Sequence, residues 1–228
     1  MPSGNLEFVE FVGGRPIPLQ EQVTSSPANL SLSNISETKR NLLEKYLRGE
    51  IQQQLALPRT IAPGPPGSPL QLSFSQERLW FLDQLNPNSA VFNVPLAVRL
   101  EGAIDPDALK RSVNEIVRRH DVLRTTFATV DGRPELDITS HLNLDLSVVD
   151  LTSYPESERE AQARALMGEE EQRPFDLTQG PLIRTTLLRL DEQDHFFLVN
   201  MHHIVSDGWS LVLFFQELSA IYEAFSRG

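Results

Sequence analysis

The spacing of apolar and polar positions separates a weakly patterned leading portion from a longer portion with regular elements. From residue 70 onward, segments with a 3.6-residue apolar period alternate with short apolar runs, which indicate helices and strands. Helices are predicted for 73–85, from 105 onward, for 156–172 and for 209–225. Strands are predicted for 91–100 and 123–130, for the returning segment after 130 that ends at about 138, and for 182–190 and 195–203. Another apolar segment covers 144–151. This mixture, with several antiparallel hairpins, predicts an α/β (α+β) two-layer sandwich in which helices cover a mixed sheet.

Two of these helices carry clear local signals. Asp105 followed by Pro106 is a cap and a first-turn proline, and it marks a helix start. The apolar stripe expected to be buried consists of Leu109, Val113, Ile116 and Val117. The helix over 156–172 is highly charged, and its thin apolar face is expected at Ala161, Ala165 and Leu166.

The first 69 residues are expected to form an appendage to the main domain. Residues 1–35 are predicted to be a flexible segment with a short hairpin within 6–19, where two prolines restrict the second strand to a sheet edge. Residues 36–56 predict an amphipathic helix, and the Pro/Gly-rich stretch 57–69 is a linker. The helix is either a packed appendage or a docking element for a partner chain. The main domain is expected to cover 70–228.

Composition removes several classes of function. The net charge of -11 argues against a nucleic-acid partner, which normally requires a basic surface. The absence of cysteine excludes disulfides and thiolate chemistry, and it fits a cytoplasmic setting. No run approaches the roughly 20 apolar residues of a membrane span, and the first residues do not resemble a secretory signal.

The organising feature of the main domain is the stretch from Phe196 to Ser210. An apolar strand leads into His202 and His203, then into a turn with Asp207 and Gly208, and then into a helix. Because successive strand side chains point to opposite faces, one histidine is expected to pack inward while the other meets a cleft. The following helix would offer free N–H groups beside that imidazole.

Other interpretations of this stretch have less support. A metal site would need a third ligand, and none stands at ligand spacing nearby. A triad would need Ser206 or Ser210 as nucleophile, yet the chain has no Gly-x-Ser-x-Gly elbow. We expect Asp207 to hold the loop by pairing with an arginine. The candidates, among which the sequence does not choose, are Arg78, Arg119 and Arg124.

Four motifs in order carry a family resemblance. His202–Gly208 (HHIVSDG) resembles the HHxxxDG signature of the condensation domains of nonribosomal peptide synthetases, within the chloramphenicol-acetyltransferase-like superfamily. Residues 72–82 (LSFSQERLWFL) resemble the opening motif of that family, with Ser75 where alanine is usual. Residues 119–127 resemble its second motif, and 173–184 resemble the segment before the histidines. The ending Asp-Gly-Trp-Ser is similar to that of the peptide-forming members.

The resemblance implies a fold and a set of roles. Members have two acetyltransferase-like lobes with a tunnel between them, and residues 70–228 would be the N-terminal lobe, incomplete without a second one. His203 would be the catalytic residue, as a base or by positioning the amine. His202 and Asp207 would be structural, and Gly208 would offer an N–H group or room near the reacting carbonyl.

The resemblance also implies partners. No metal and no directly bound cofactor are expected. The substrates are attached to the phosphopantetheine arms of two peptidyl carrier proteins, one that carries the donor and one that carries the acceptor. Residues 1–56 are expected to contact an upstream synthetase subunit, and no nucleic acid or membrane is expected to bind. The expected product is an amide. The alternatives are a stand-alone acyltransferase that uses coenzyme A and a non-catalytic lobe that only binds a carrier protein.

Overall fold

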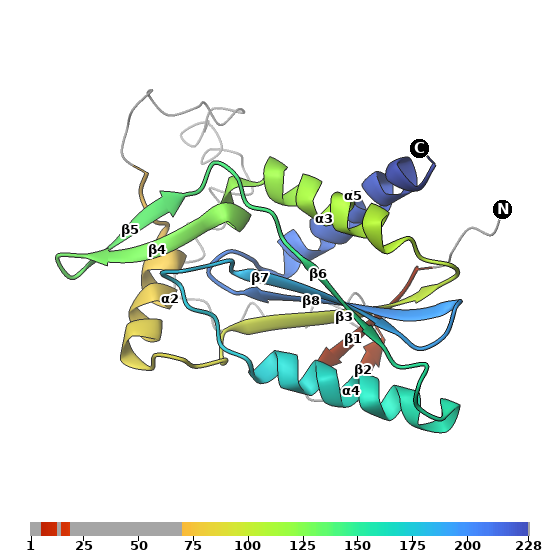
Figure 1. The fold of residues 1–228 in the computed structure, drawn as a ribbon. Helices are drawn as coiled ribbons and strands as arrows, with labels where there is room; N and C mark the ends of the chain where they lie inside the picture. The colour runs from red at the N-terminus through yellow and green to blue at the C-terminus, as the bar shows by residue number, and fades with distance from the viewer. Residues whose placement is uncertain (1–5, 13–14, 19–69, 228) are drawn as a thin grey trace, which may run out of the picture. The chain divides into compact units, whose positions relative to one another are not determined.

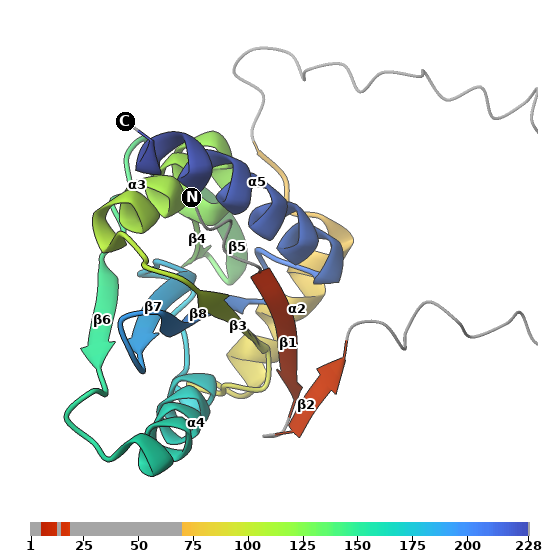
Figure 2. The same ribbon diagram turned by 90° about the vertical axis from the view of Figure 1, so that its right-hand side faces the viewer.

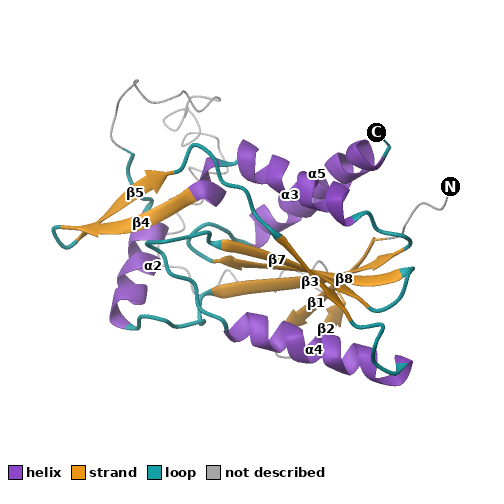
Figure 3. Cartoon of the chain, viewed as in Figure 1, coloured by secondary structure: helices purple, strands orange, loops and turns teal. Residues whose placement is uncertain are grey.

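A computed structural model describes residues 6–12, 15–18 and 70–227 of the chain (Figure 1). The main portion contains both helices and strands, connected by loops (Figure 3). The elements, in chain order, are β1 (Leu6–Val12), β2 (Arg15–Pro18), α2 (Phe74–Leu85), β3 (Asn93–Glu101), α3 (Pro106–Arg119), the 3₁₀ turn η3 (Asp121–Arg124), β4 (Thr125–Val130), β5 (Arg133–Ile138), β6 (Leu146–Asp150), α4 (Glu156–Gln172), β7 (Ile183–Arg189), β8 (Asp194–His202) and α5 (Gly208–Ser226).

The main sheet has the strand order β2-β1-β3-β8-β7-β6, and β4 pairs only with β5 in a separate ribbon. β6 and β7 run parallel, whereas the other neighbouring strands run antiparallel. The expected mixed sheet is therefore confirmed. β1 and β2 pair at the position where a short hairpin is predicted, and β1 joins the main sheet along β3.

Strand β8 lies at the centre of the sheet and is buried on both faces. Phe197 and Val199 point into a cluster with α3 and α5, whereas Phe196 and Leu198 point into a cluster with α4. Covering helices on both sides explain why this strand is almost continuously apolar. Figure 2 shows α3 and α5 on one side of the sheet and α4 on the other. The expected helical cover of the sheet is therefore confirmed, but because it lies on both faces the domain has three layers and not the two that the sequence predicts.

The helix starting at Asp105 forms as predicted, because the Asp105 carboxylate accepts hydrogen bonds from the N–H groups of Asp107 and Ala108. Its predicted stripe is buried. The apolar face predicted for α4 is wrong at Ala161 and Ala165, which are exposed. Ala163 and Met167 are buried instead, because packing against the sheet rather than local pattern selects the face of a weakly amphipathic helix.

The strand predicted for 123–130 begins later than expected. Residues 121–124 form the turn η3, and β4 starts at Thr125. The guanidinium of Arg124 donates to the carbonyls of Val117 and Thr139. It therefore provides a donor to a backbone carbonyl near the end of α3 and holds the turn beside the end of β5. No interaction of this kind is visible in a local apolar pattern.

The predicted helix over 36–56 and linker over 57–69 lie outside the described residues, as does most of the predicted flexible segment 1–35. Within the described part of the chain, none of the helices combines the length and the apolar character needed to cross a lipid bilayer.

Candidate active site

The end of β8 opens onto a groove of about 930 Å³. The N-terminal part of α2 contributes Ser75 and Arg78 to the lining, and the turn after β8 contributes His203 and Asp207. The turn is firmly packed, because Ile204 and Val205 are buried in a cluster beneath α2. The groove therefore has a rigid wall formed by residues far apart in the sequence.

His202 is buried, with only 1% of its surface exposed. Its ring packs edge-on against Phe92 and Phe175. Burial, with a smaller contribution from the charge of His203, lowers the pKa of His202 to about 4. Its Nδ1 accepts a hydrogen bond of 3.1 Å from the N–H of Ile204. A neutral ring with an accepting Nδ1 must carry its proton on Nε2.

His203 is exposed and lines the groove. Its backbone N–H donates to the carbonyl of Phe92 at 2.8 Å. Its Nδ1 lies 2.6 Å from the carbonyl oxygen of Ser206, and because a carbonyl only accepts, Nδ1 must be the donor. In the neutral ring, Nε2 is then left with a free lone pair. The opposite directions of the two histidines agree with strand alternation.

Asp207 caps α5. Its carboxylate accepts from the Ser210 N–H at 2.8 Å, and the Ser210 hydroxyl accepts from the Asp207 N–H at 2.7 Å. The hydrogen bonds from the backbone and side chain of Ser210 hold the pKa of Asp207 below its ordinary value, with a smaller contribution from His203. Ser210, considered above as a nucleophile, is thus engaged in the capping box.

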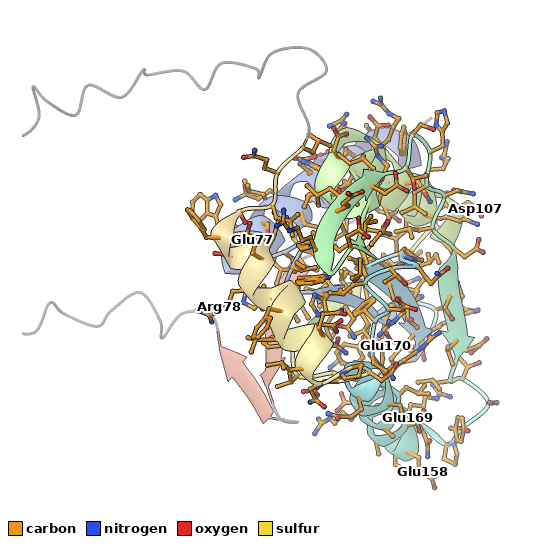
Figure 4. All side chains as sticks on the ribbon, turned by 90° about the vertical axis from the view of Figure 1, so that its left-hand side faces the viewer. Glu77, Arg78, Asp107, Glu158, Glu169 and Glu170 are labelled. Carbon is orange, nitrogen blue, oxygen red and sulfur yellow. The ribbon has the colours of Figure 1, made fainter. Side chains whose placement is uncertain are left out.

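The arginine pairing expected for Asp207 is corrected by the structure. Arg119 pairs with Glu115 at 2.8 Å, and Arg124 pairs with Asp121. Arg78 is exposed on α2 beside Glu77, as Figure 4 shows, and it makes no ion pair among residues 70–227. Helix capping satisfies the Asp207 carboxylate, so the carboxylate needs no cation.

Gly208 is the first residue of α5, and its backbone conformation does not require glycine. Its φ lies outside the left-handed region, and a Cβ built on it would meet no atom within 4 Å. The space beside Gly208 therefore opens away from the described lobe. Its N–H belongs to the first helical turn, where backbone donors lack intrahelical partners.

Sequence reasoning missed Gln76, which connects α2 to the histidine turn. Its Nε2 donates to the carbonyl of Ile204 in a long contact of 3.4 Å, while its Oε1 accepts from the N–H of Ser73 at 2.9 Å. The signal was the pair Ser73 and Gln76, three residues apart ahead of an apolar run, which is typical of a capping box. That pattern predicts the helix start but not the contact with the turn.

Within residues 70–227, no group of three or more histidine or carboxylate side chains is arranged to hold a metal ion. What remains at the groove is the exposed imidazole of His203, whose Nδ1 is bound to a backbone carbonyl and which stands at the end of a central strand beside a helix N-terminus. Such a group accepts, donates or relays one proton.

Comparisons with known proteins identify the family of this chain. The family model described as Condensation domain matches residues 68–228, so the chain belongs to the condensation-domain family. Among curated relatives, it is 53% identical over 158 residues to one of the subunits of linear gramicidin synthase from Brevibacillus parabrevis, covering 69% of this chain and 3% of that relative. It is 40% identical over 199 residues to phosphinothricin tripeptide synthetase PhsC from Streptomyces viridochromogenes, covering 86% of this chain and 18% of that protein.

Solved structures show the same fold. The starter condensation domain of rhizomide synthetase RzmA superposes with a TM-score of 0.66 at 30% identity, covering 71% of this chain and 39% of that one. The first condensation domain of the calcium-dependent antibiotic synthetase also gives a TM-score of 0.66, at 26% identity, covering 71% of this chain and 39% of that domain. The chain thus spans well under half the length of these relatives.

Proposed function

We propose that this chain supplies the histidine-bearing lobe of a condensation domain that forms an amide from a thioester and an amine. The observation that carries the proposal is the state of His203. Its Nδ1–H is bound to the Ser206 carbonyl, and its Nε2 has no partner among residues 70–227. An exposed imidazole whose tautomer is fixed in this way suits proton transfer at the groove.

In the proposed reaction, the amine nitrogen of the acceptor attacks the carbonyl carbon of the donor thioester. A C–N bond forms, the C–S bond breaks, and the thiol leaves. The amine loses one proton and the departing thiolate gains one. Nε2 of His203 can take the proton and return it, or it can hold the amine in line for attack. Proton transfer by a placed imidazole typically contributes ~10²–10⁴ in rate.

Gly208 supports the proposal from the other side of the turn. Its N–H lies in the first turn of α5, where the helix dipole favours negative charge, and a Cβ built on it would meet no atom within 4 Å. We assign to it either donation to the oxygen that becomes negative during attack or close approach of the substrate. The carboxylate of Asp207 is occupied in capping and serves to hold this turn.

The proposed substrates are acyl or peptidyl and aminoacyl groups on the phosphopantetheine arms of carrier proteins in the cytoplasm. The relatives named above are synthetases and synthetase subunits, which supports this partner class. Residues 1–56 are proposed to contact an upstream subunit. The described part of that segment, β1 and β2, is attached to the main sheet along β3.

A second candidate donor is an acyl group on coenzyme A. One RzmA starter-domain structure, of a single-substitution mutant, contains C8-CoA, and the structure of a double mutant contains C8-CoA and Leu-SNAC. Those ligands belong to that protein. They favour testing acyl-CoA beside the loaded carrier protein, because coenzyme A ends in the same phosphopantetheine arm.

The test uses the complete condensation domain with donor and acceptor each loaded on a carrier protein, and product is measured by mass spectrometry. His203→Ala is expected to lower the rate by ~10²–10⁴. The matched control is His141→Ala, which removes an exposed histidine that does not line the groove. Full activity of His203→Ala would refute the catalytic role. If product forms from acyl-CoA but not from the loaded carrier protein, the donor is acyl-CoA. If the wild type forms no product from either donor, the lobe only binds a carrier protein.

A further inference from the structure

Of the buried side-chain polar atoms that have no hydrogen-bonding partner among the described residues, three belong to the adjoining strands β3 and β8 at the end that leads into the histidine turn. They are Nε2 of His202, Oδ1 of Asn93 and Oδ1 of Asn200. Buried polar atoms are nearly always hydrogen-bonded, to protein or to ordered water. Three unpartnered atoms in one region therefore require an explanation.

Sheet register places the three side chains on one face. Asn93 is the cross-strand neighbour of His202, and Pro95 is the neighbour of Asn200. Because His203 donates to Phe92 whereas His202 donates to Leu182 on the other side, Asn93 and His202 form a non-hydrogen-bonded pair, in which side chains lie closest. Asn200 precedes His202 by two residues and points to the same face.

Both asparagines also reach the same end of α4. Nδ2 of Asn93 donates to the carbonyls of Glu171 at 2.7 Å and Arg173 at 2.9 Å. Nδ2 of Asn200 donates to the carbonyl of Glu170 at 2.8 Å. Carbonyls only accept, so these contacts fix which end of each amide is nitrogen. Each Oδ1 is thereby left as an unpaired acceptor below the last turn of α4.

The three atoms are chemically complementary. His202 accepts through Nδ1, so its Nε2 is a donor, and the two Oδ1 atoms are acceptors. A water molecule that accepts one hydrogen bond and donates two satisfies all three, and buried waters typically make about three hydrogen bonds to such groups. A direct bond between His202 and Asn93 would leave Asn200 unsatisfied.

We propose that one buried water bridges Nε2 of His202 to Oδ1 of Asn93 and Oδ1 of Asn200, and that the two asparagines are thereby positioning residues for His203. The ring of His202, held at Nε2, accepts the Ile204 N–H at Nδ1 and so sets the turn on which His203 stands. Gln76 holds the carbonyl of the same Ile204 from α2. The end of α4 is in this way connected to the imidazole at the groove.

The site is tested first by crystallography of the complete condensation domain, at a resolution that shows buried water. Density for one water within hydrogen-bonding distance of the three atoms is expected. The water site would be refuted if only carbon atoms contact Nε2 of His202. It would also be refuted if His202 and Asn93 are hydrogen-bonded directly. This arm does not depend on catalysis.

The kinetic arm rests on the proposed function. Asn93→Leu and Asn200→Leu each keep the number and branching of the side-chain heavy atoms but remove the Oδ1 acceptor together with the Nδ2 donor to the end of α4. Each is expected to lower turnover on the order of 10- to 100-fold while KM for the loaded carriers is unchanged. The control Asn114→Leu also removes amide hydrogen bonds, one within α3 to Lys110 and one between separate segments to Leu144, but it lies outside the network, so its turnover should match the wild type.

The two proposals fail in distinguishable ways. Wild-type turnover in both Asn93→Leu and Asn200→Leu, with folding verified by circular dichroism, would refute the positioning role even if His203→Ala is inactive. An active His203→Ala variant would refute the proposed catalytic role, and the bridging water would still be decided by its density. If Asn93→Leu does not fold, Asn200→Leu and the crystal structure decide the matter.

Discussion

Burial of the His202 imidazole makes the stability of this fold depend on pH. The ring is 1% exposed, and its burial, with the charge of His203 as a smaller cause, lowers its pKa from 6.5 to about 4. In the unfolded chain the pKa returns to its ordinary value of about 6.5. Between these two pH values the unfolded chain binds a proton that the folded chain does not. The free energy of unfolding therefore falls as the pH falls through this window.

The size of the effect follows from the two pKa values. A difference of roughly 2.5 units corresponds to about 3 kcal/mol once the pH is below the folded pKa. At a pH of about 5 the unfolded ring is largely protonated and the folded ring is not, which gives a loss of about 2 kcal/mol. At a pH of about 8 the ring is neutral in both states and contributes no pH dependence.

Urea unfolding of the wild type and of His202→Asn, each at a pH of about 8 and of about 5, measures this loss. The asparagine oxygen can take the place of Nδ1 as acceptor for the Ile204 N–H, and it does not titrate. The wild type is expected to lose about 2 kcal/mol more than the variant. His195, whose pKa is also lowered by burial, is present in both proteins, so its contribution cancels. Equal losses would show that His202 does not titrate as its burial requires.

Three further outcomes follow from the turns around the site. Asp207→Ala is expected to lower the free energy of unfolding by about 1 kcal/mol through loss of the cap, and Asp207→Asn by much less, in chemical denaturation. Gly180→Ala is expected to cost roughly 1–3 kcal/mol, because its φ is +59° and a Cβ would lie 2.9 Å from Cγ2 of Thr126; Thr126→Ser in that background should recover only the steric part. Gly208→Ala should change stability by less than about 0.5 kcal/mol yet slow condensation in the complete domain. A matching loss of stability would assign Gly208 to folding instead.

The elements that could be predicted from sequence are those whose signals are local. Strand alternation gave His202 and His203 opposite directions, and the structure buries one and exposes the other. The Asp105 cap and the stripe after it are local too, and α3 forms as they predict. In each case the same residues that carry the pattern make the contacts.

The predictions that failed depended on contacts that the local pattern does not contain. An arginine partner for Asp207 was reasonable on charge alone, but Ser210, three residues along the chain, satisfies the carboxylate first. The buried face of α4 is decided by packing against the sheet, and the apolar positions of the helix are too few to select that face by themselves. The contact of Gln76 with Ile204 spans 128 residues, and nothing in the local sequence predicts it.

Under the proposed function, the groups at the groove differ in what each can contribute to catalysis. The described lobe fixes the imidazole of His203 by a backbone carbonyl and a packed turn, and under the proposed function this imidazole would transfer a proton or position the amine. Negative charge that develops on the donor carbonyl oxygen needs a donor or a cation as well. Within residues 70–227, Arg78 is the cation among the groove-lining residues, and it is exposed. Under the proposed function, the backbone N–H groups at the start of α5 are therefore the donors that the described lobe can offer to that oxygen.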